Sequence, residues 1–463
     1  MKSYFNRLAP SRDNWHRKNR LYHRILEKHF SLIIPQGSRV IEMGCSTGDL
    51  LNSVNPSLGI GIDFSENMVA IAREKYPHLQ FVCADVALYH SDVTFDYIII
   101  SDLLSSLLDI QSFLKNLSHL CHARTRLVFS SYNYLWEPVL KLGEILGIKA
   151  RQPRQSWLTI KDIQNLLALE NFEVIRVDRK LLLPKYLPFL HTIFNVFLSN
   201  LPGLNRLNLI NLISARPYER SSSEYPVSIV IPARNERGNI EDAVKRTPVF
   251  GLHQEFIFIE GHSSDNTFDE ILRVQRKYPG KDIIGMQQTG KGKGNAVREA
   301  FEVAKGEILI ILDADLTTPP EDLPKFYHAI AGNAGEFING CRLIYPLEKE
   351  AMRFLNLIGN KFFSLVFSFL LGQRLKDTLC GTKVLFRKDY NKIKVNRKYF
   401  GEFDPFGDFD LLFGAAKLNL KIVEVPIRYR DRRYGSSQIN RFSHGWLLLR
   451  MCFFAAKKIK FIA

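Results

Sequence analysis

Short apolar runs alternate along the chain with longer mixed stretches, and several of the runs end in polar or acidic residues. Residues 308–312 are all Ile or Leu and lead directly to Asp313 and Asp315. A continuous apolar run of this length predicts a strand buried on both faces, as in a parallel sheet covered by helices. Comparable runs predict strands near 38–43, 58–62, 79–83, 95–100, 226–231, 255–259 and 283–286, with helices at 65–76, 160–170 and 268–278. This alternation indicates an α/β protein that binds its ligands at the carboxyl ends of the strands.

The length of 463 residues exceeds what one hydrophobic core usually supports, so two domains are expected. A polar stretch at 217–225 is the predicted linker between a first domain at 31–216 and a second at 226–446. Residues 1–30 are interpreted as an N-terminal extension. Residues 447–463 are interpreted as a basic, possible membrane-interfacial helix.

The net charge of +16 and the pI near 9.5 indicate an anionic partner or surface. Basic residues form no stripe with interleaved aromatic residues, so nucleic acid is not the expected partner. The six cysteines include no C-x-x-C pair, which disfavours a disulfide framework or a zinc site and favours a reducing cytosol. No signal peptide or spanning helix is expected, because no apolar run approaches about 20 residues.

A glycine-containing turn, Glu42-Met43-Gly44-Cys45-Ser46-Thr47-Gly48, follows the first predicted strand. The second strand ends at Asp63, about 20 residues after Glu42, the spacing at which an acid accepts hydrogen bonds from ribose in mononucleotide-binding units. Two later strands lead to Asp85 and to Ser101. Together these elements predict a nucleotide-type pocket along one edge of the sheet.

These residues resemble the class I S-adenosylmethionine (SAM)-dependent methyltransferases, which implies a Rossmann-like sheet and SAM as cofactor. Ser46 departs from the family, because it stands where the middle glycine of the turn is usual. No residue identifies the methyl acceptor, so catalysis and cofactor binding without turnover both stay open. The resemblance assigns Glu42, Gly44 and Gly48 to the cofactor turn, Asp63 to the ribose, Asp85 to the adenine amino group and Ser101 to the methionine part.

An apolar segment at 181–215 is interrupted by Pro184, Pro188 and Pro202. The favoured interpretation is a helical cap over the substrate entrance, and the alternative is a membrane-facing patch. A strand at 172–177 is expected to complete the first sheet.

The acidic pair Asp313 and Asp315 lies on one side of an extended backbone, because the side-chain period of a strand is two. Such oxygen ligands suit Mg²⁺ or Mn²⁺ bound jointly with substrate phosphates, although a pair of solvated loop aspartates is the alternative. Residues 290–295 interleave glycines and lysines, a composition that can cradle a diphosphate or form an ordinary flexible turn.

The order of these motifs is similar to that in family 2 glycosyltransferases of the GT-A fold, in particular the dolichyl- and polyprenyl-phosphate sugar synthases. Two departures are Glu260, where aspartate is usual, and Gln438, where lysine is usual. The resemblance assigns Pro232, Arg234, Glu236, Glu260, Lys293, Asp313 and Arg432 to the nucleotide-sugar, Asp313 and Asp315 to the metal, Arg342 and Arg353 to an acceptor phosphate, and Asp377 with Asp315 to catalysis.

The resemblance implies an inverting, metal-dependent transfer in which Lys293 or Arg432 helps to neutralise the departing diphosphate. With a polyprenyl-phosphate acceptor, which is already ionised, Asp377 would only orient groups. With a glycan hydroxyl acceptor, Asp377 would have to take a proton. The full hypothesis is a bifunctional enzyme that also uses SAM to methylate a linked intermediate.

Two apolar stretches, 352–371 and 445–463, bear on the location of the protein. Each is typical either of a core helix or of a helix in a membrane interface. We expect a cytoplasmic protein attached peripherally to the inner face of a membrane. One alternative is a soluble, hydroxyl-directed glycosyltransferase in polysaccharide assembly whose first domain binds SAM without turnover. A Q-x-x-R-W-like stretch at 438–442, as in processive synthases, is interpreted as coincidence because Phe442 replaces tryptophan.

Overall fold

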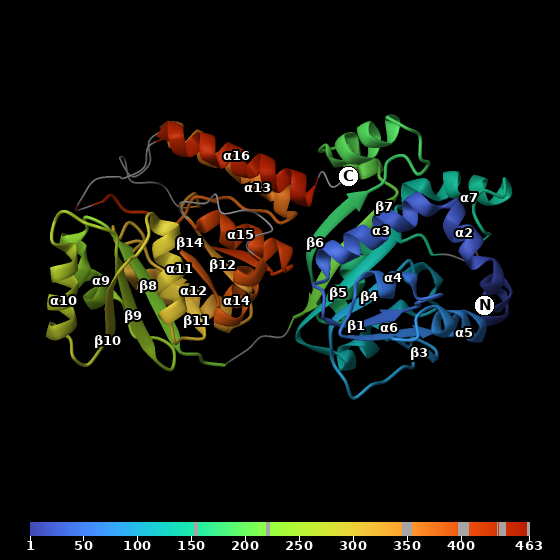
Figure 1. Ribbon diagram of the computed structural model, residues 1–463, viewed down its shortest axis with the longest axis horizontal. Helices are drawn as coiled ribbons and strands as arrows, with labels where there is room; N and C mark the ends of the chain where they lie inside the picture. Colours follow the sequence, from blue (N-terminus) through green and yellow to red (C-terminus); the bar gives the residue numbers. More distant parts are fainter. Residues whose placement is uncertain are drawn as a thin grey trace. The chain divides into compact units, whose positions relative to one another are not determined.

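The computed structural model describes residues 1–151, 156–218, 223–344, 354–396, 407–432, 434 and 441–460. The chain divides into two compact units, Met1–Glu219 with Lys460–Ala463, and Arg220–Ile459. Each unit is built on a seven-stranded sheet with helices packed around it (Figure 1). The predicted α/β class with two domains is confirmed.

The sheet of unit 1 has the strand order β3-β2-β1-β4-β5-β7-β6. Neighbours from β3 to β5 pair in parallel, whereas β7 runs antiparallel to both β5 and β6. The strands are β1 (Arg39–Met43), β2 (Leu58–Asp63), β3 (Gln80–Cys83), β4 (Phe95–Ser101), β5 (Cys121–Tyr132), β6 (Phe172–Lys180) and β7 (Ile210–Pro217).

Strand β7 corrects the prediction of an apolar cap at 181–215, because the end of that segment is a strand inserted between β5 and β6. Ile210 and Leu212 pack into the core on one face of the sheet, and Ile213 and Ala215 into the core on the other. A strand buried on both faces has the same continuous apolar sequence as a buried helix, so periodicity could not distinguish them. The strand expected at 172–177 is present as β6 at the edge of the sheet, where it pairs antiparallel with β7.

Two layers of helices bury the two faces of this sheet. Phe30 of α3 and Leu51 of α4 pack with Val40 on one face, while Phe113 of α6 and Ile163 of α8 pack on the other. Residues 1–30 lie within unit 1 and form α1, α2 and most of α3. The helices are α1 (Lys2–Leu8), α2 (Arg12–Lys18), α3 (Arg20–Ile33), α4 (Asp49–Ser53), α5 (Glu66–Lys75), α6 (Ile110–Leu117), α7 (Glu137–Ile145) and α8 (Ile160–Leu169).

The sheet of unit 2 has the strand order β10-β9-β8-β11-β13-β12-β14. Every neighbouring pair is parallel except those of β13, which runs antiparallel to β11 and to β12. The strands are β8 (Val227–Ala233), β9 (Gln254–Glu260), β10 (Asp282–Gln287), β11 (Ile308–Ile311), β12 (Phe337–Cys341), β13 (Lys383–Phe386) and β14 (Ile422–Pro426).

Helices again cover both faces, with two hydrophobic cores on opposite sides of the strands. Helix α13 begins at Phe354, so Met352 and Arg353 of the predicted helix lie outside the described residues. Helices α13 and α16 lie side by side (Figure 1). The helices are α9 (Ile240–Arg246), α10 (Thr267–Lys277), α11 (Lys293–Val303), α12 (Leu323–Ala331), α13 (Phe354–Leu371), α14 (Arg387–Asn396), α15 (Asp408–Lys417) and α16 (Arg441–Ile459).

Among the described residues, no helix combines the length and the apolar character needed to cross a bilayer.

Candidate functional site

In unit 1, strand register brings the predicted cofactor residues to one edge of the sheet. Met43 of β1 pairs with Ile62 of β2 on one side and with Ile100 of β4 on the other. The residues that follow these three are Gly44, Asp63 and Ser101, so all three sit at the same carboxyl edge. Asp85 follows β3, the next strand outward, and is exposed.

The turn after β1 is held tightly by its surroundings. Gly44 and Gly48 have φ angles of +77° and +80°, and Ser46 between them has φ +49°. A side chain at Gly48 would meet the ring of Phe81 at 2.7 Å, so close packing as well as φ requires glycine there. The guanidinium of Arg12, from α2, donates to the Ser46 hydroxyl over 3.1 Å.

Two buried carboxyl groups lie beneath and beside this turn. Asp63 accepts from the backbone N–H of Ser46 and of Ser65, each over 2.9 Å, and burial raises its pKa. These two bonds leave lone pairs on the Asp63 oxygens that hydroxyl groups can fill. Burial also raises the pKa of Glu42 well above its usual range, and its Oε2 has no hydrogen-bond partner among the described residues. This donor and acceptor set fits a ribose-containing cofactor.

A buried network that the sequence did not reveal adjoins this edge. The Tyr22 hydroxyl of α3 donates to Asp102 Oδ2, and the Ser130 hydroxyl donates to Asp102 Oδ1 over 2.8 Å. Burial raises the pKa of both Tyr22 and Asp102. Nothing in the sequence pairs Tyr22 with Asp102, because they lie 80 positions apart on a helix and on a loop.

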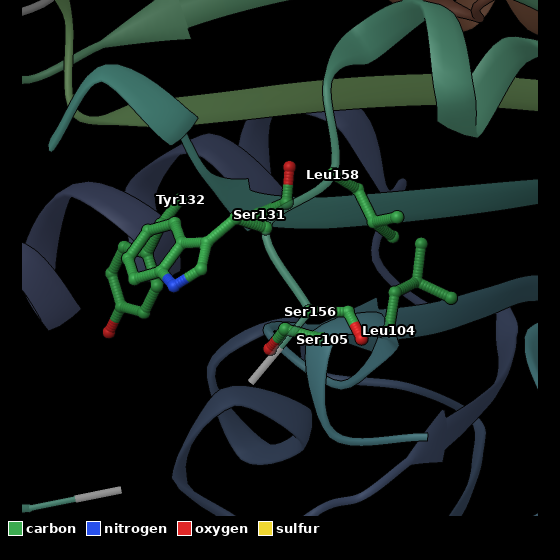
Figure 2. A pocket seen from close by; sticks show the side chains of 7 residues that line it. Leu104, Ser105, Ser131, Tyr132, Ser156 and Leu158 are labelled. Carbon is green, nitrogen blue, oxygen red and sulfur yellow. The ribbon is translucent and has the colours of Figure 1, made fainter. Parts of the chain in front are cut away.

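A pocket opens next to this network, between the ends of β4 and β5. Figure 2 shows Tyr132 on one side and Leu104 and Leu158 on the other, with Ser105 and Ser156 at its base. The Ser156 N–H donates to the Ser105 carbonyl over 2.8 Å and joins the two walls. The pocket is lined by Leu104, Ser105, Ser131, Tyr132, Ser156, Trp157 and Leu158.

In unit 2, the first charged cluster forms around Asp313, two residues beyond β11. The ammonium group of Lys293, the first residue of α11, lies 2.6 Å from Asp313 Oδ1. Burial acts to raise the pKa of Asp313, but the positive charge of Lys293 holds it below its usual range. Gly381 touches this pair, because a Cβ there would overlap the Asp313 carboxylate and lie 2.6 Å from the Lys293 ammonium.

A second cluster connects Asp315 to the loop after β8. The guanidinium of Arg432 donates to Glu236 Oε1 over 2.6 Å and to Asp315 Oδ2 over 2.7 Å. Asp315 Oδ1 accepts from the N–H and hydroxyl of Thr317, over 3.1 and 2.8 Å. Burial raises the pKa of Glu236 to about 7. Three predicted residues from distant parts of the chain therefore meet in one ion-paired group.

The third cluster is the pair of Arg342 and Asp377. Asp377 Oδ2 accepts from Arg342 Nε over 2.7 Å, and Oδ1 accepts from Arg342 Nη2 over 2.8 Å. Oδ1 also accepts from Asn360 Nδ2 over 2.8 Å. Burial acts to raise the pKa of Asp377, but Arg342 lowers it to about 2. The guanidinium also stacks over Tyr429, 5.1 Å from the ring centre.

The remaining predicted donor-binding residues lie along the same edge of the sheet. Ala233 pairs with Glu260, and Glu260 with Gln287, so the ends of β8, β9 and β10 are level. Pro232 lies in β8, Arg234 is exposed just beyond it, and Glu260 is buried with its carboxylate accepting from the Ser263 N–H. Arg353, predicted to bind the acceptor phosphate, and Gln438 lie outside the described residues.

Comparison with known families assigns both units. Residues 14–177 match the family described as a methyltransferase domain, and residues 228–394 match glycosyl transferase family 2. The chain joins a methyltransferase domain to a family 2 glycosyltransferase domain. Both predicted resemblances are confirmed at this level.

The relatives of the glycosyltransferase domain include two with related names. The dolichol-phosphate mannosyltransferase of Pyrococcus furiosus is 29% identical over 218 residues, or 46% of this chain and 59% of that protein. The undecaprenyl-phosphate 4-deoxy-4-formamido-L-arabinose transferase of Edwardsiella ictaluri is 34% identical over 220 residues, or 46% of this chain and 62% of that protein. The chain thus spans about three fifths of each relative.

Among solved structures, a SAM-dependent methyltransferase from Thermotoga maritima, described as a possible histamine N-methyltransferase, is 15% identical. The match covers 47% of this chain and 100% of the Thermotoga chain, with a TM-score of 0.38.

A metal site in the glycosyltransferase domain would be incomplete without substrate. The described residues contain no group of three or more His, Cys, Asp or Glu side chains able to hold a metal ion. Magnesium commonly binds through one or two carboxylates together with substrate phosphates, so Asp313 and Asp315 fit that partial role.

Proposed function

We propose that the glycosyltransferase domain transfers a sugar from a nucleotide-sugar to a polyprenyl phosphate. The names of the two relatives support a lipid-phosphate acceptor. In this reaction an acceptor phosphate oxygen bonds to the anomeric carbon as the bond from that carbon to the nucleoside diphosphate breaks. The electron pair leaves with the diphosphate, the anomeric configuration inverts, and no proton has to move.

The observation that carries this proposal is the saturation of Asp377. Both of its oxygens are occupied, it has no solvent exposure, and its pKa is about 2. Such a carboxylate is a poor proton acceptor at neutral pH. The geometry therefore favours an acceptor that needs no general base, which a phosphate satisfies and a sugar hydroxyl does not. Asp377 is then a positioning residue for Arg342.

Arg342 is the residue proposed to bind the acceptor phosphate. Its side chain is only 12% exposed, and Asp377 and Tyr429 fix the plane of the guanidinium. A planar guanidinium matches the geometry of phosphate oxygens, and holding it in advance lowers the entropic cost of binding.

Lys293 and Arg432 are the cations proposed to receive the leaving diphosphate. Each is paired with one aspartate, and each aspartate side chain stays partly exposed, at 30% for Asp313 and 16% for Asp315. Asp313 and Asp315 would hold Mg²⁺ or Mn²⁺ together with phosphate oxygens of the donor. When bound, the ion would supply charge neutralisation for the diphosphate.

For the methyltransferase domain we propose that Glu42, Gly44, Gly48, Asp63, Asp85 and Ser101 bind SAM. When bound, SAM supplies a methyl group as a sulfonium. The domain's own contribution is to align an acceptor, since methyl transfer depends chiefly on proximity and orientation. The pocket beside Tyr132 and Leu104 is the proposed acceptor position, and the proposed acceptor is an intermediate linked to the sugar product.

We further propose that the glycosyltransferase domain works at the inner face of a membrane. Helices α13 and α16 expose large apolar side chains, including Phe362, Leu365, Trp446 and Phe453. Lysines follow Phe453 in the last turn of α16. Apolar and aromatic residues with nearby lysines are typical of a helix in the membrane interface.

A transfer screen tests the proposed activity. Purified full-length protein is incubated with Mn²⁺, a panel of nucleotide-sugars and polyprenyl phosphate in detergent. Sugar on the lipid, lost with a chelator and restored by Mn²⁺, is the expected result. Donor hydrolysis without a lipid product would move the acceptor to a glycan hydroxyl and overturn the positioning role of Asp377.

A further inference from the structure

A broad set of exposed apolar side chains lies on the methyltransferase domain, in α7 and in the segment 186–207. Helix α7 has no buried residue, and Ile145 at its end is 70% exposed. The segment 186–207 exposes further large apolar side chains, and Phe189 is 88% exposed. We call the following residues the α7 surface: Val139, Leu142, Ile145 and Leu146 from α7 and its end, and Tyr186, Phe189, Ile193, Phe197, Leu201 and Leu207 from the segment.

Hydrogen bonds join the two parts of the α7 surface into one structure. The Trp136 indole N–H, at the start of α7, donates to the Leu207 carbonyl over 2.7 Å. The Asn133 amide donates to the carbonyls of Arg206 and Asn208, each over 2.8 Å. The two apolar stretches are therefore neighbours in the fold, although about 50 residues separate them in the sequence.

The segment is also anchored by hydrogen bonds to the residues just before it, so its exposed side chains stand on a fixed backbone. The Asn195 side chain accepts from the Leu183 N–H and donates to the Leu183 carbonyl, both over 2.8 Å. On α7, Trp136 and Leu140 pack against the core of the domain, which leaves the apolar side chains of the other face outside.

The charges around the α7 surface identify its partner. Residues 181–209 contain no Asp or Glu. The two acids of α7 are neutralised, Glu137 by Lys141 and Glu144 by Lys149. Arg206 is exposed within the segment, and Lys185 is exposed directly before it.

Two more arginines lie close to the same surface. The first is Arg179, whose pKa is lowered mainly by burial and also by the charge of Arg206. The second is Arg24, whose charge, after burial, lowers the pKa of His191. The border of the α7 surface is thus cationic, which complements an anionic surface.

We infer that the α7 surface docks the methyltransferase domain onto an anionic lipid bilayer. Exposed aliphatic and aromatic side chains bordered by Lys and Arg are the combination that a negatively charged membrane interface binds. A second copy is a poorer occupant, because a twofold contact would bring the cationic borders of identical surfaces together. Tyr132 of the pocket comes directly before the turn into α7, so docking would place the pocket beside the lipid.

Vesicle binding of the full-length protein tests this inference. Because α16 can bind lipid on its own under the proposed function, every variant is made in a Trp446→Ser, Phe453→Ser background. The probes are vesicles of phosphatidylcholine alone and of phosphatidylcholine with phosphatidylglycerol. We expect the background protein still to bind the anionic vesicles, and more weakly as salt rises.

Two variants remove the two components of the α7 surface separately. Ile145→Ser with Phe189→Ser should weaken partition about tenfold or more on anionic vesicles. Lys185→Gln with Arg206→Gln should weaken it about tenfold on anionic vesicles and leave binding to neutral vesicles unchanged. Leu108→Ser is the matched control, since Leu108 is a fully exposed apolar residue of the same unit outside the α7 surface.

If the double variant Ile145→Ser with Phe189→Ser partitioned onto anionic vesicles as strongly as the Leu108→Ser control, the inference would be overturned. A wild-type dimer that the Ile145 and Phe189 substitutions convert to monomer would also overturn it, since a second copy would then cover the surface. The charge variant changes only exposed side chains and guards against a folding defect in the apolar variant. Sugar transfer in detergent is measured in parallel, so failure of the proposed function is seen separately.

Discussion

The glycosyltransferase domain holds two aspartate sites that differ in how completely the protein satisfies them. Asp377 is fully buried, and Arg342, Asn360 and the Leu379 N–H occupy its oxygens. Asp313 and Asp315 are partly exposed, and each is paired with a single cation. The first site is closed to solvent, whereas the side chains of Asp313 and Asp315 remain 30% and 16% exposed, although Thr317 and Arg432 donate to Asp315. This difference in exposure underlies the proposal that Asp377 positions Arg342 while Asp313 and Asp315 bind the donor.

Asp315→Ala should give the largest effect, because it removes a proposed metal ligand and the partner of Arg432 together. We expect sugar transfer to fall about a thousandfold or more. SAM binding, measured by calorimetry, should be unchanged, because the two sites lie in separate units. Asp322→Ala is the control, because the partner of Asp322 among the described residues is the exposed Lys325. If sugar transfer and SAM binding were lost together, the two sites would not be independent.

Asp377→Ala should damage the fold, because it leaves the Arg342 guanidinium buried without a counter-charge. Removing one partner of a buried ion pair costs roughly 3–5 kcal/mol. Hydrogen exchange in β12 and β13 reports the stability of this domain alone. Asp313→Ala, at the open site, should change the same protection by less than about 1 kcal/mol. Similar losses in both variants would remove the distinction between the two sites.

Gly381→Ala sharpens the comparison without removing a charge. The added Cβ would overlap the Asp313 carboxylate, so the carboxylate and the Lys293 ammonium must move. We expect sugar transfer to fall about tenfold or more, since displacements near 1 Å disturb a reacting geometry. Gly280→Ala is the control, because a Cβ at Gly280 meets nothing within 4 Å. An unchanged rate of sugar transfer would show that transfer does not depend on the position of the Asp313 carboxylate and the Lys293 ammonium.

Glu236→Gln should give the smallest effect, visible as a change in pH dependence. Burial raises the pKa of Glu236 from 4.5 to about 7. In that range the folded state keeps a proton that the unfolded state releases, so the free energy of unfolding falls as pH rises from about 4.5 to about 7. The substitution should remove this component, measured by hydrogen exchange in β8 and β9.

Glu241→Gln is the matched control for pH, because the Lys277 and Arg273 side chains lower the pKa of Glu241 to about 2, outside this range. A pH slope that survives Glu236→Gln would assign the titration to another group.

Several parts of the site could be predicted because they follow strands. Asp313, Glu260 and Asp63 each follow or end an apolar run, and parallel strands bring such positions to one edge. The pairing of Arg432 with Glu236 and Asp315 could not be predicted, because 196 and 117 positions separate the partners. Tyr22, from a helix interpreted as lying before the domain, gave no signal of its contact with Asp102.

The sequence by itself determined the α/β class, the two-domain division and the residues that stand at strand ends, because these depend on local hydrophobic periodicity. Only the tertiary structure decided that residues 210–217 form a strand, and that Asp377 is fully buried while Asp313 and Asp315 stay partly exposed. It also brought α7 beside the segment 186–207. These properties depend on which distant groups meet and on how much water they exclude, and local periodicity carries no information about either.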